Sequence, residues 1–158
     1  MAGQTVNKGG RAAWVVIGGA LLLGTLLSVF VVYPNLKKSA ASIGAKMREL
    51  DTLGATMTAD QCVEHVIDWF QHCDVMPAMC LQEVPKAVAH CLRAKDRTSE
   101  CEPLLALPPT SQWTYHRCAD QGIDKGSKKE LTKYCTAAWR ALDHYCKSGQ
   151  RGVVWGVK

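Results

Sequence analysis

Hydrophobic residues fill one unbroken stretch near the N-terminus and recur farther along only as periodic stripes. The stretch from Ala12 to Tyr33 reads AAWVVIGGALLLGTLLSVFVVY, 22 residues without a charge. A helix of this length is about 33 Å long, which matches the roughly 30 Å hydrocarbon core of a bilayer. The run is longer than the apolar region of a signal peptide and has no clean A-x-A cleavage site. We therefore expect an uncleaved transmembrane helix over residues 12–33, ended by Pro34.

Small residues form a stripe on one face of this helix. Ala20, Gly24 and Ser28 follow each other at four-residue intervals. Such a stripe allows a second transmembrane helix to approach closely, so we take these residues as candidate packing positions. The alternative is that glycine and serine are simply common in membrane helices.

After the apolar run, the hydrophobic spacing becomes helical. Residues 34–57 are expected to form a stalk, which either extends the membrane helix or links it to a domain. Thr58 and Gln61 have the spacing of a capping box and predict a helix start. In the helix that follows, one face carries Cys62, Val66, Trp69, Phe70 and Cys73.

Proline and glycine set the expected bounds of the later helices. Because Pro85 is tolerated in a first turn but not in a helix interior, the second helix should begin near Glu83 and leave Cys80 in the preceding turn. A third helix is expected over residues 110–121, with Gly122 as its C′ residue. A long fourth helix should follow the capping box of Ser127 and Glu130 and end at Gly149.

No strand pattern competes with these helices. We predict an all-α chain, with one N-terminal transmembrane helix followed by two disulfide-stapled helical hairpins. The expected parts are an N-terminal tail (1–11), the transmembrane helix (12–33), the stalk (34–57), a first disulfide-linked hairpin (58–95), a second disulfide-linked helical region (96–149) and a C-terminal tail (150–158).

The cysteine content indicates the compartment. All eight cysteines follow the apolar run, and their number is even. This density is typical of an oxidising compartment on the C-terminal side of the membrane. Lysine and arginine flank the apolar run on both sides, so the positive-inside rule does not decide the orientation.

The first four cysteines have a palindromic spacing. Ten, six and ten residues separate Cys62, Cys73, Cys80 and Cys91. Eleven positions advance a helix by about three turns plus 20°, which places the first two cysteines on one face. An antiparallel hairpin then pairs Cys62 with Cys91 and Cys73 with Cys80. Closing the 30-residue outer loop contributes roughly 3–4 kcal/mol to stability in the chain-entropy model.

The other four cysteines repeat this spacing less regularly. We propose the pairs Cys118–Cys135 and Cys101–Cys146 for the second half, although eight cysteines allow 105 pairings and the sequence does not choose rigorously among them. Disulfides suit a domain of short helices with narrow apolar faces, because such helices bury little area.

Motifs for chemistry are missing. Histidines lie near several cysteines, but the chain has no C-x2-C pair for zinc, no C-x-x-C redox motif, no haem-attachment motif and no nucleotide-binding loop. We expect no enzyme activity, metal or cofactor. The net charge of +5 is spread among interspersed acidic and basic residues, which does not indicate nucleic-acid binding. Core packing is the expected role of the aromatic residues Trp69, Phe70, Trp113, Tyr134 and Trp139.

The paired ten-residue spacings, at 62–73, 80–91 and 135–146, resemble the coiled-coil-helix-coiled-coil-helix (CHCH) family. Its members hold two helices, each with a C-x9-C pattern, by two concentric disulfides. The ten-residue gap and Pro85 depart from that pattern. The resemblance implies residence in the mitochondrial intermembrane space, oxidative folding there and service as an accessory subunit of inner-membrane assemblies. Trp69-Phe70 before Cys73 is similar to the import signals of that family.

The leading hypothesis is a non-catalytic accessory subunit of an inner-membrane complex, of the mitochondrial respiratory-chain type. Its partners would be the bilayer and other transmembrane and intermembrane-space subunits, without nucleic acid. One alternative is a membrane-anchored binding or envelope component of a bacterial periplasm. A second alternative is a thiol-redox protein or metallochaperone.

Overall fold

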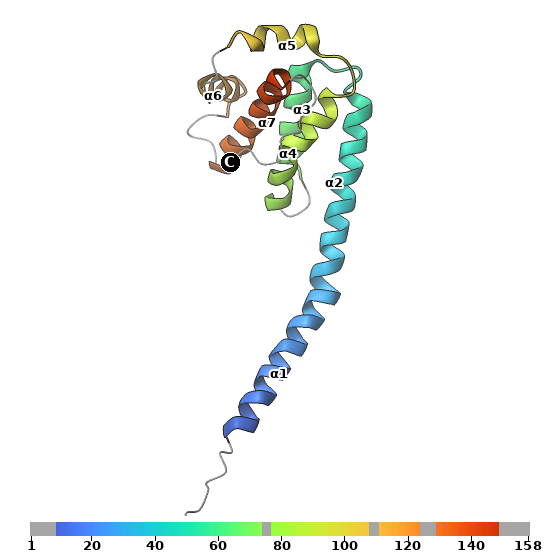
Figure 1. Cartoon of the computed structure of the whole chain (residues 1–158), viewed down its shortest axis with the longest axis vertical. Helices are drawn as coiled ribbons and strands as arrows, with labels where there is room; N and C mark the ends of the chain where they lie inside the picture. The colour runs from blue at the N-terminus through green and yellow to red at the C-terminus, as the bar shows by residue number, and fades with distance from the viewer. Residues whose placement is uncertain (1–8, 74–76, 108–110, 124–128, 149–158) are drawn as a thin grey trace, which may run out of the picture. The chain divides into compact units, whose positions relative to one another are not determined.

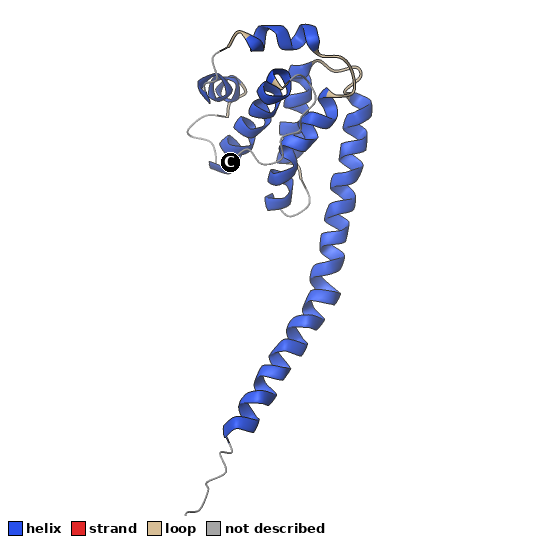
Figure 2. Cartoon of the chain, viewed as in Figure 1, coloured by secondary structure: helices blue, strands red, loops and turns tan. Residues whose placement is uncertain are grey.

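The computed structural model describes residues 9–73, 77–107, 111–123 and 129–148, which form helices and turns without a strand among them (Figures 1 and 2). The predicted all-α class is therefore confirmed for this part of the chain. Two compact units divide the chain, at Met1–Ala40 and Ala41–Lys158. In chain order the helices are α1 (Gly9–Leu27), the π-helix η1 (Ser28–Val32), α2 (Tyr33–Leu53), α3 (Ala59–Gln71), α4 (Pro77–Leu92), α5 (Thr98–Leu105), α6 (Ser111–Asp120) and α7 (Lys129–Lys147).

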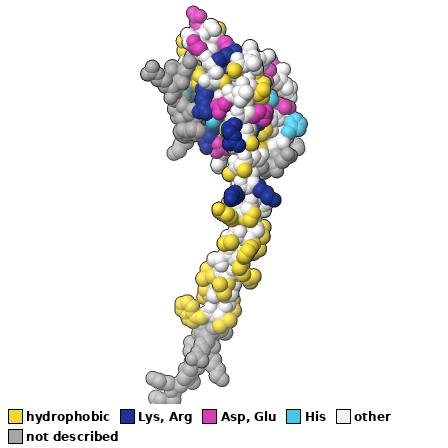
Figure 3. Space-filling model, turned by 90° about the vertical axis from the view of Figure 1, so that its right-hand side faces the viewer, with side chains coloured by type: hydrophobic (Ala, Val, Ile, Leu, Met, Phe, Trp, Pro, Cys, Tyr) yellow, Lys and Arg dark blue, Asp and Glu magenta, His cyan; other side chains and the backbone are white. Residues whose placement is uncertain are grey.

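The helix of the first unit keeps its apolar side chains uncovered. From Trp14 to Tyr33 the large hydrophobic side chains are 49–75 % exposed. The candidate span Trp14–Leu53 contains a window of mean hydropathy 2.6, none of which is buried. By length and composition this helix is able to cross a membrane. Figure 3 shows hydrophobic side chains gathered along it, whereas charged side chains are interspersed over the larger unit.

Pro34 does not end the helix, contrary to the sequence-based expectation. Helical backbone continues from η1 into α2, and the N–H of Tyr33 donates to the carbonyl of Ser28, five residues back. Proline has no N–H for the carbonyl of Phe30, and its ring crowds that carbonyl. The wider π-turn just before Pro34 accommodates the ring, so the helix adjusts its local winding and continues.

The segment predicted as a stalk belongs partly to the domain. The second compact unit begins at Ala41, not at residue 58. Within α2, one face carries Ile43, Met47 and Leu50, and all three are buried in the core. Their spacing is that of an apolar helix stripe. The second half of α2 is therefore a core helix. The glycines at 44 and 54 made the same segment look like a possible linker in the sequence.

Helix α7 is the central element of the second unit. It packs against α3, α4, α5 and α6, as Figure 1 shows for the neighbouring ribbons. One core runs through residues of both predicted halves, so residues 58–95 and 96–149 do not form separate cores. The buried stripe of α7 comprises Tyr134, Cys135, Ala138, Trp139, Leu142, Tyr145 and Cys146.

Helix α4 begins earlier than Pro85 predicted. It starts at Pro77, where proline suits a first helical position, and it contains both Cys80 and Pro85. The expectation that Cys80 lies in a turn was wrong. The physical reason is a buried stripe that continues past Pro85 toward the N-terminus, because burial of that face outweighs the cost of an interior proline. Its completely buried members are Cys80, Val84, Ala87, Val88, Cys91 and Leu92.

Two other predicted helix limits agree with the structure. Thr58 and Gln61 form both hydrogen bonds of the capping box at the start of α3. Gly122 follows α6 and has a φ of 75°, a conformation that favours glycine. Ser127 and Gly149, the predicted limits of the last helix, lie outside the described residues.

Candidate functional site

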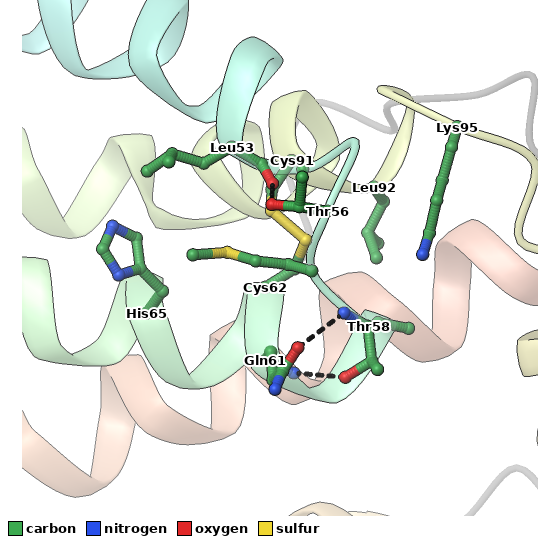
Figure 4. The surroundings of a disulfide bond; sticks show 12 residues. Leu53, Thr56, Thr58, Gln61, Cys62, His65, Cys91, Leu92 and Lys95 are labelled. Carbon is green, nitrogen blue, oxygen red and sulfur yellow. Dashed lines mark hydrogen bonds between the residues drawn. A yellow bond between two sulfur atoms is a disulfide. The ribbon is translucent and has the colours of Figure 1, made fainter.

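Four disulfides frame the second unit, and they join the same pairs that the cysteine spacing predicts. Two of them link α3, or the residues directly after it, to α4, and two link α7 to its other neighbours. The Cα–Cα distances are 5.7 Å for Cys62–Cys91, 6.7 Å for Cys73–Cys80, 5.1 Å for Cys101–Cys146 and 6.0 Å for Cys118–Cys135. All eight cysteines lie among the described residues, and none of them is free. Figure 4 shows the Cys62–Cys91 bond beside the capping box of Thr58 and Gln61.

A buried arginine ties together the segments around this disulfide. Arg97 is completely covered, and its guanidinium donates to the carbonyl oxygens of Gly54 (2.7 Å), Met57 (2.6 Å) and Leu92 (3.1 Å). A buried cation is stable only when its donors are satisfied in this way. Arg97 therefore fixes the turn after α2 against the end of α4. Sequence reasoning missed this role because the acceptors are backbone groups without a sequence signal.

Glu100 completes the arginine cluster. Its carboxylate lies 3.1 Å from Arg97 Nη1 and accepts the backbone N–H of Ala59 at the start of α3. Burial alone would raise the pKa of Glu100. The Ala59 N–H, Arg97 and the more distant Lys95 outweigh burial and hold the pKa below its ordinary value. The ionised form of Glu100 thus binds the starts of α3 and α5 together.

Side chains on α2 contact polar side chains of α3 and of the end of α4. Asp51 Oδ1 lies 3.0 Å from His90 Nδ1 and 3.0 Å from Arg93 Nη2. Lys46 approaches His65 on α3, with 3.1 Å between Nζ and Nε2. His65 and His90 therefore contact side chains of α2, whereas the nearby Cys62 and Cys91 are bonded to each other. Among the described residues, no group of three or more His, Cys, Asp or Glu side chains is arranged to hold a metal ion.

The aromatic residues lie in the core or at its edge. Tyr134 and Trp139 are buried, and burial raises the pKa of Tyr134 to about 12. Phe70 contacts Tyr134, with ring centroids 3.7 Å apart. Trp113 meets Trp139 edge-on at 6.1 Å. This packing joins α3 and α6 to α7 and accounts for four of the five aromatic residues that were assigned to packing; the fifth, Trp69, packs against the same core.

A shallow groove of about 450 Å³ lies where α5 and α6 meet the start of α3. Apolar side chains of Pro103, Leu104, Leu107 and Trp113 line part of it. Arg117 pairs with Asp60 at its polar side and places its guanidinium 4.4 Å from the Trp139 ring centroid.

The candidate membrane-packing residues lie on one continuous helical stretch. Ala20 and Gly24 belong to α1, and Ser28 is the first residue of η1. The space beside Gly24 is open, since a Cβ built there would have no neighbour within 4 Å. Ser28 donates its hydroxyl to the carbonyl of Gly24 (2.9 Å) and is therefore satisfied within its own helix. Close packing against another transmembrane helix stays a prediction.

Comparisons with known proteins add no relative to this picture. No family model matched the chain, and no curated protein or solved structure matched it significantly. The resemblance to the CHCH family therefore depends on the cysteine spacing alone, and the functional conclusion has to come from the two units themselves.

Proposed function

We propose that this chain is a single-pass membrane protein that acts as a non-catalytic accessory subunit of an inner-membrane complex. One observation carries the proposal: an uncovered apolar helix and a domain closed by four disulfides occur in the same chain. The helix requires lipid or other transmembrane helices around it. The disulfides require an oxidising compartment around the domain.

In this proposal the disulfide-linked domain lies in the mitochondrial intermembrane space, as the resemblance to the CHCH family implies. In this proposal the helix docks through Ala20, Gly24 and Ser28, and the disulfide-linked domain covers part of the complex outside the membrane. A bacterial periplasm provides the same redox conditions and is the alternative location. The identity of the co-purifying subunits separates these two cases.

Purification of the full chain in a mild detergent tests the proposal. We expect the chain to elute with other membrane subunits in fixed ratio. Gly24→Leu should weaken this association because the added side chain keeps a second helix away. Leu22→Ile, on the opposite face of the helix, is the matched control and should leave it intact. A monodisperse chain that elutes without partners would contradict the proposal.

A count of thiols addresses the redox alternative. Alkylation of the denatured, unreduced protein should find no free thiol, since all eight cysteines are bonded. Two or more free thiols, or stoichiometric zinc or copper, would instead favour a thiol-redox protein or metallochaperone.

A further inference from the structure

One of the four disulfides is only partly buried. Seven of the eight cysteines are buried in the second unit, and the exception is Cys73, which is bonded to Cys80. Cys73 follows the end of α3 and is only partly covered, whereas Cys80 is completely covered in the first turns of α4. This bond therefore presents one residue to solvent and keeps the other against the protein.

We propose that Cys73–Cys80 is a thiol–disulfide exchange site, which an external dithiol reduces while the other three disulfides stay closed. The inference goes beyond the accessory role, since it assigns a reaction to one bond. The reactant is identified by its chemistry alone: a small or protein-borne dithiol that reaches the partly exposed Cys73.

The exchange proceeds in two substitutions. A thiolate of the dithiol attacks Cys73 Sγ, the sulfur of the partly exposed residue, and forms a mixed disulfide as the Cys73–Cys80 bond breaks. Cys80 leaves as a thiolate near the N-terminal end of α4, where the helix dipole favours negative charge, and takes a proton from water. The second thiolate of the reactant then attacks its own sulfur in the mixed disulfide and releases Cys73. Two electrons pass from the dithiol, which ends as a disulfide.

The other three bonds are protected by their position. Their six cysteines are at most 5 % exposed, so a reductant reaches them only after part of the core opens. For this reason we expect Cys73–Cys80 to be reduced at least about tenfold faster than the next bond.

Reduction of the exchange site should leave the fold in place. Cys62–Cys91 still joins α3 to α4, and both helices still pack against α7. Cys73–Cys80 also spans the shortest of the four loops, with a sequence separation of 7. In the chain-entropy model the shortest loop contributes least to stability. The change is therefore local to Cys73 and the first turns of α4.

Stepwise reduction of the full-length protein in detergent tests the proposal. The protein is treated with increasing dithiothreitol, quenched with N-ethylmaleimide and mapped by mass spectrometry. The first reduced species should carry two labels, on Cys73 and Cys80, and keep its helical circular dichroism. Labels that appear first on another pair, simultaneous labelling of all cysteines, or loss of helix at the first step would each overturn the proposal.

Two further measurements sharpen this test. With glutathione, a monothiol, the mixed disulfide should be found on Cys73, and an adduct on Cys80 instead would overturn the assigned direction of attack. The variant Cys73→Ser/Cys80→Ser should lose the fast-reacting pair. Its matched control, Cys118→Ser/Cys135→Ser, should retain that pair with at most about a twofold change in rate. A fast pair that persists in the first variant would contradict the site.

Discussion

Helices α1 and α7 have the same length, 19 residues each, and are stabilised in opposite ways. The described large side chains of α1 are apolar and uncovered. In α7 one stripe is buried among four other helices, and charged residues such as Lys133 and Arg140 occupy the exposed face. Because α1 is apolar on every face, its composition alone indicates an apolar environment. In α7 only one face is apolar, so the spacing of its hydrophobic residues indicates which face is buried.

The same difference separates the two units. The described helix of the first unit has uncovered apolar side chains, so substitutions there should change whether the chain resides in a membrane. The second unit carries its own core, its disulfides and a buried arginine paired with Glu100, and substitutions there should change its free energy of unfolding. Variants that affect one property without the other are the way to test this division.

The largest effect is expected for Arg97→Ala. The carbonyl oxygens of Gly54, Met57 and Leu92 would lose their buried donor, which should lower the free energy of unfolding by about 3–5 kcal/mol. Urea unfolding under non-reducing conditions measures it. Arg93→Ala, at a half-exposed arginine that pairs with Asp51, is the control and should cost less than about 1 kcal/mol. Equal costs would contradict the role of the buried cluster.

Removal of the disulfide with the widest span should have the next largest effect. Cys101→Ser/Cys146→Ser opens a link with a sequence separation of 45 and should cost about 4 kcal/mol of stability. Cys73→Ser/Cys80→Ser opens the shortest loop and should cost about 2.5 kcal/mol. Thermal unfolding of both variants provides the comparison, and the reverse order would show that loop length does not control these contributions.

A charge in α1 should affect residence and not the fold. Leu22→Arg should disfavour membrane insertion by about 3 kcal/mol, because an arginine replaces a leucine near the centre of the apolar run. The fraction that resists alkaline extraction from membranes measures this. Leu22→Ala is the matched control and should remain in the membrane. If Leu22→Arg instead lowered the unfolding temperature of the domain while staying inserted, the division between units would fail.

Two glycines in and after α2 should respond in opposite directions. A Cβ at Gly54 would overlap the carbonyl of Cys91, so Gly54→Ala should cost about 1–3 kcal/mol. At Gly44, inside α2, the nearest atom to a Cβ is the end of Arg48 at 3.8 Å. Gly44→Ala should therefore stabilise the domain by about 0.5–1 kcal/mol. Denaturant titration measures the free energy of unfolding of both variants. A change of the same sign in both would contradict the packing described at the two glycines.

The smallest effect concerns pH. Because the folded-state pKa of Glu100 lies below its unfolded value, the ionised carboxylate contributes stability above the unfolded pKa, and this is lost as pH falls through the folded pKa. Glu100→Gln should destabilise the protein by about 1 kcal/mol near pH 7 and by less near pH 3. Glu64→Gln, on the exposed side of α3, is the control. A pH-independent cost for Glu100→Gln would contradict the sign.

The features that could be predicted from the sequence depend on residues that lie close together in the chain. The eleven-residue spacing of Cys62–Cys73 and Cys80–Cys91 is close to a whole number of helical turns, so it predicts the two bonds between α3 and α4. The pairs of the second half also coincide with those in the structure, although their spacing is less regular and the sequence does not choose rigorously among the pairings. The capping box at Thr58 is likewise a local signal. Pro85 misled the start of α4 because its local cost is smaller than the gain from the buried stripe that begins at Cys80.

The features that were missed depend on distant segments. The burial of Arg97 requires carbonyl acceptors from the turn after α2 and from α4, which no single stretch of sequence specifies. The share of α2 in the core could have been found from Ile43, Met47 and Leu50, whose spacing is regular. The central place of α7 follows from packing on four helices, and its periodicity predicts only that one face is buried.

The position of α7 also sets the order in which the domain can be completed during synthesis. The ribosome releases α3 and α4 well before α7, so their apolar faces wait without the helix that covers them. These faces stay uncovered, or are held by a chaperone, during this interval. A premature stop codon between residues 119 and 128 would then leave Cys101 and Cys118 without partners and remove the centre of the core, so even such a late nonsense mutation should yield an unfolded product.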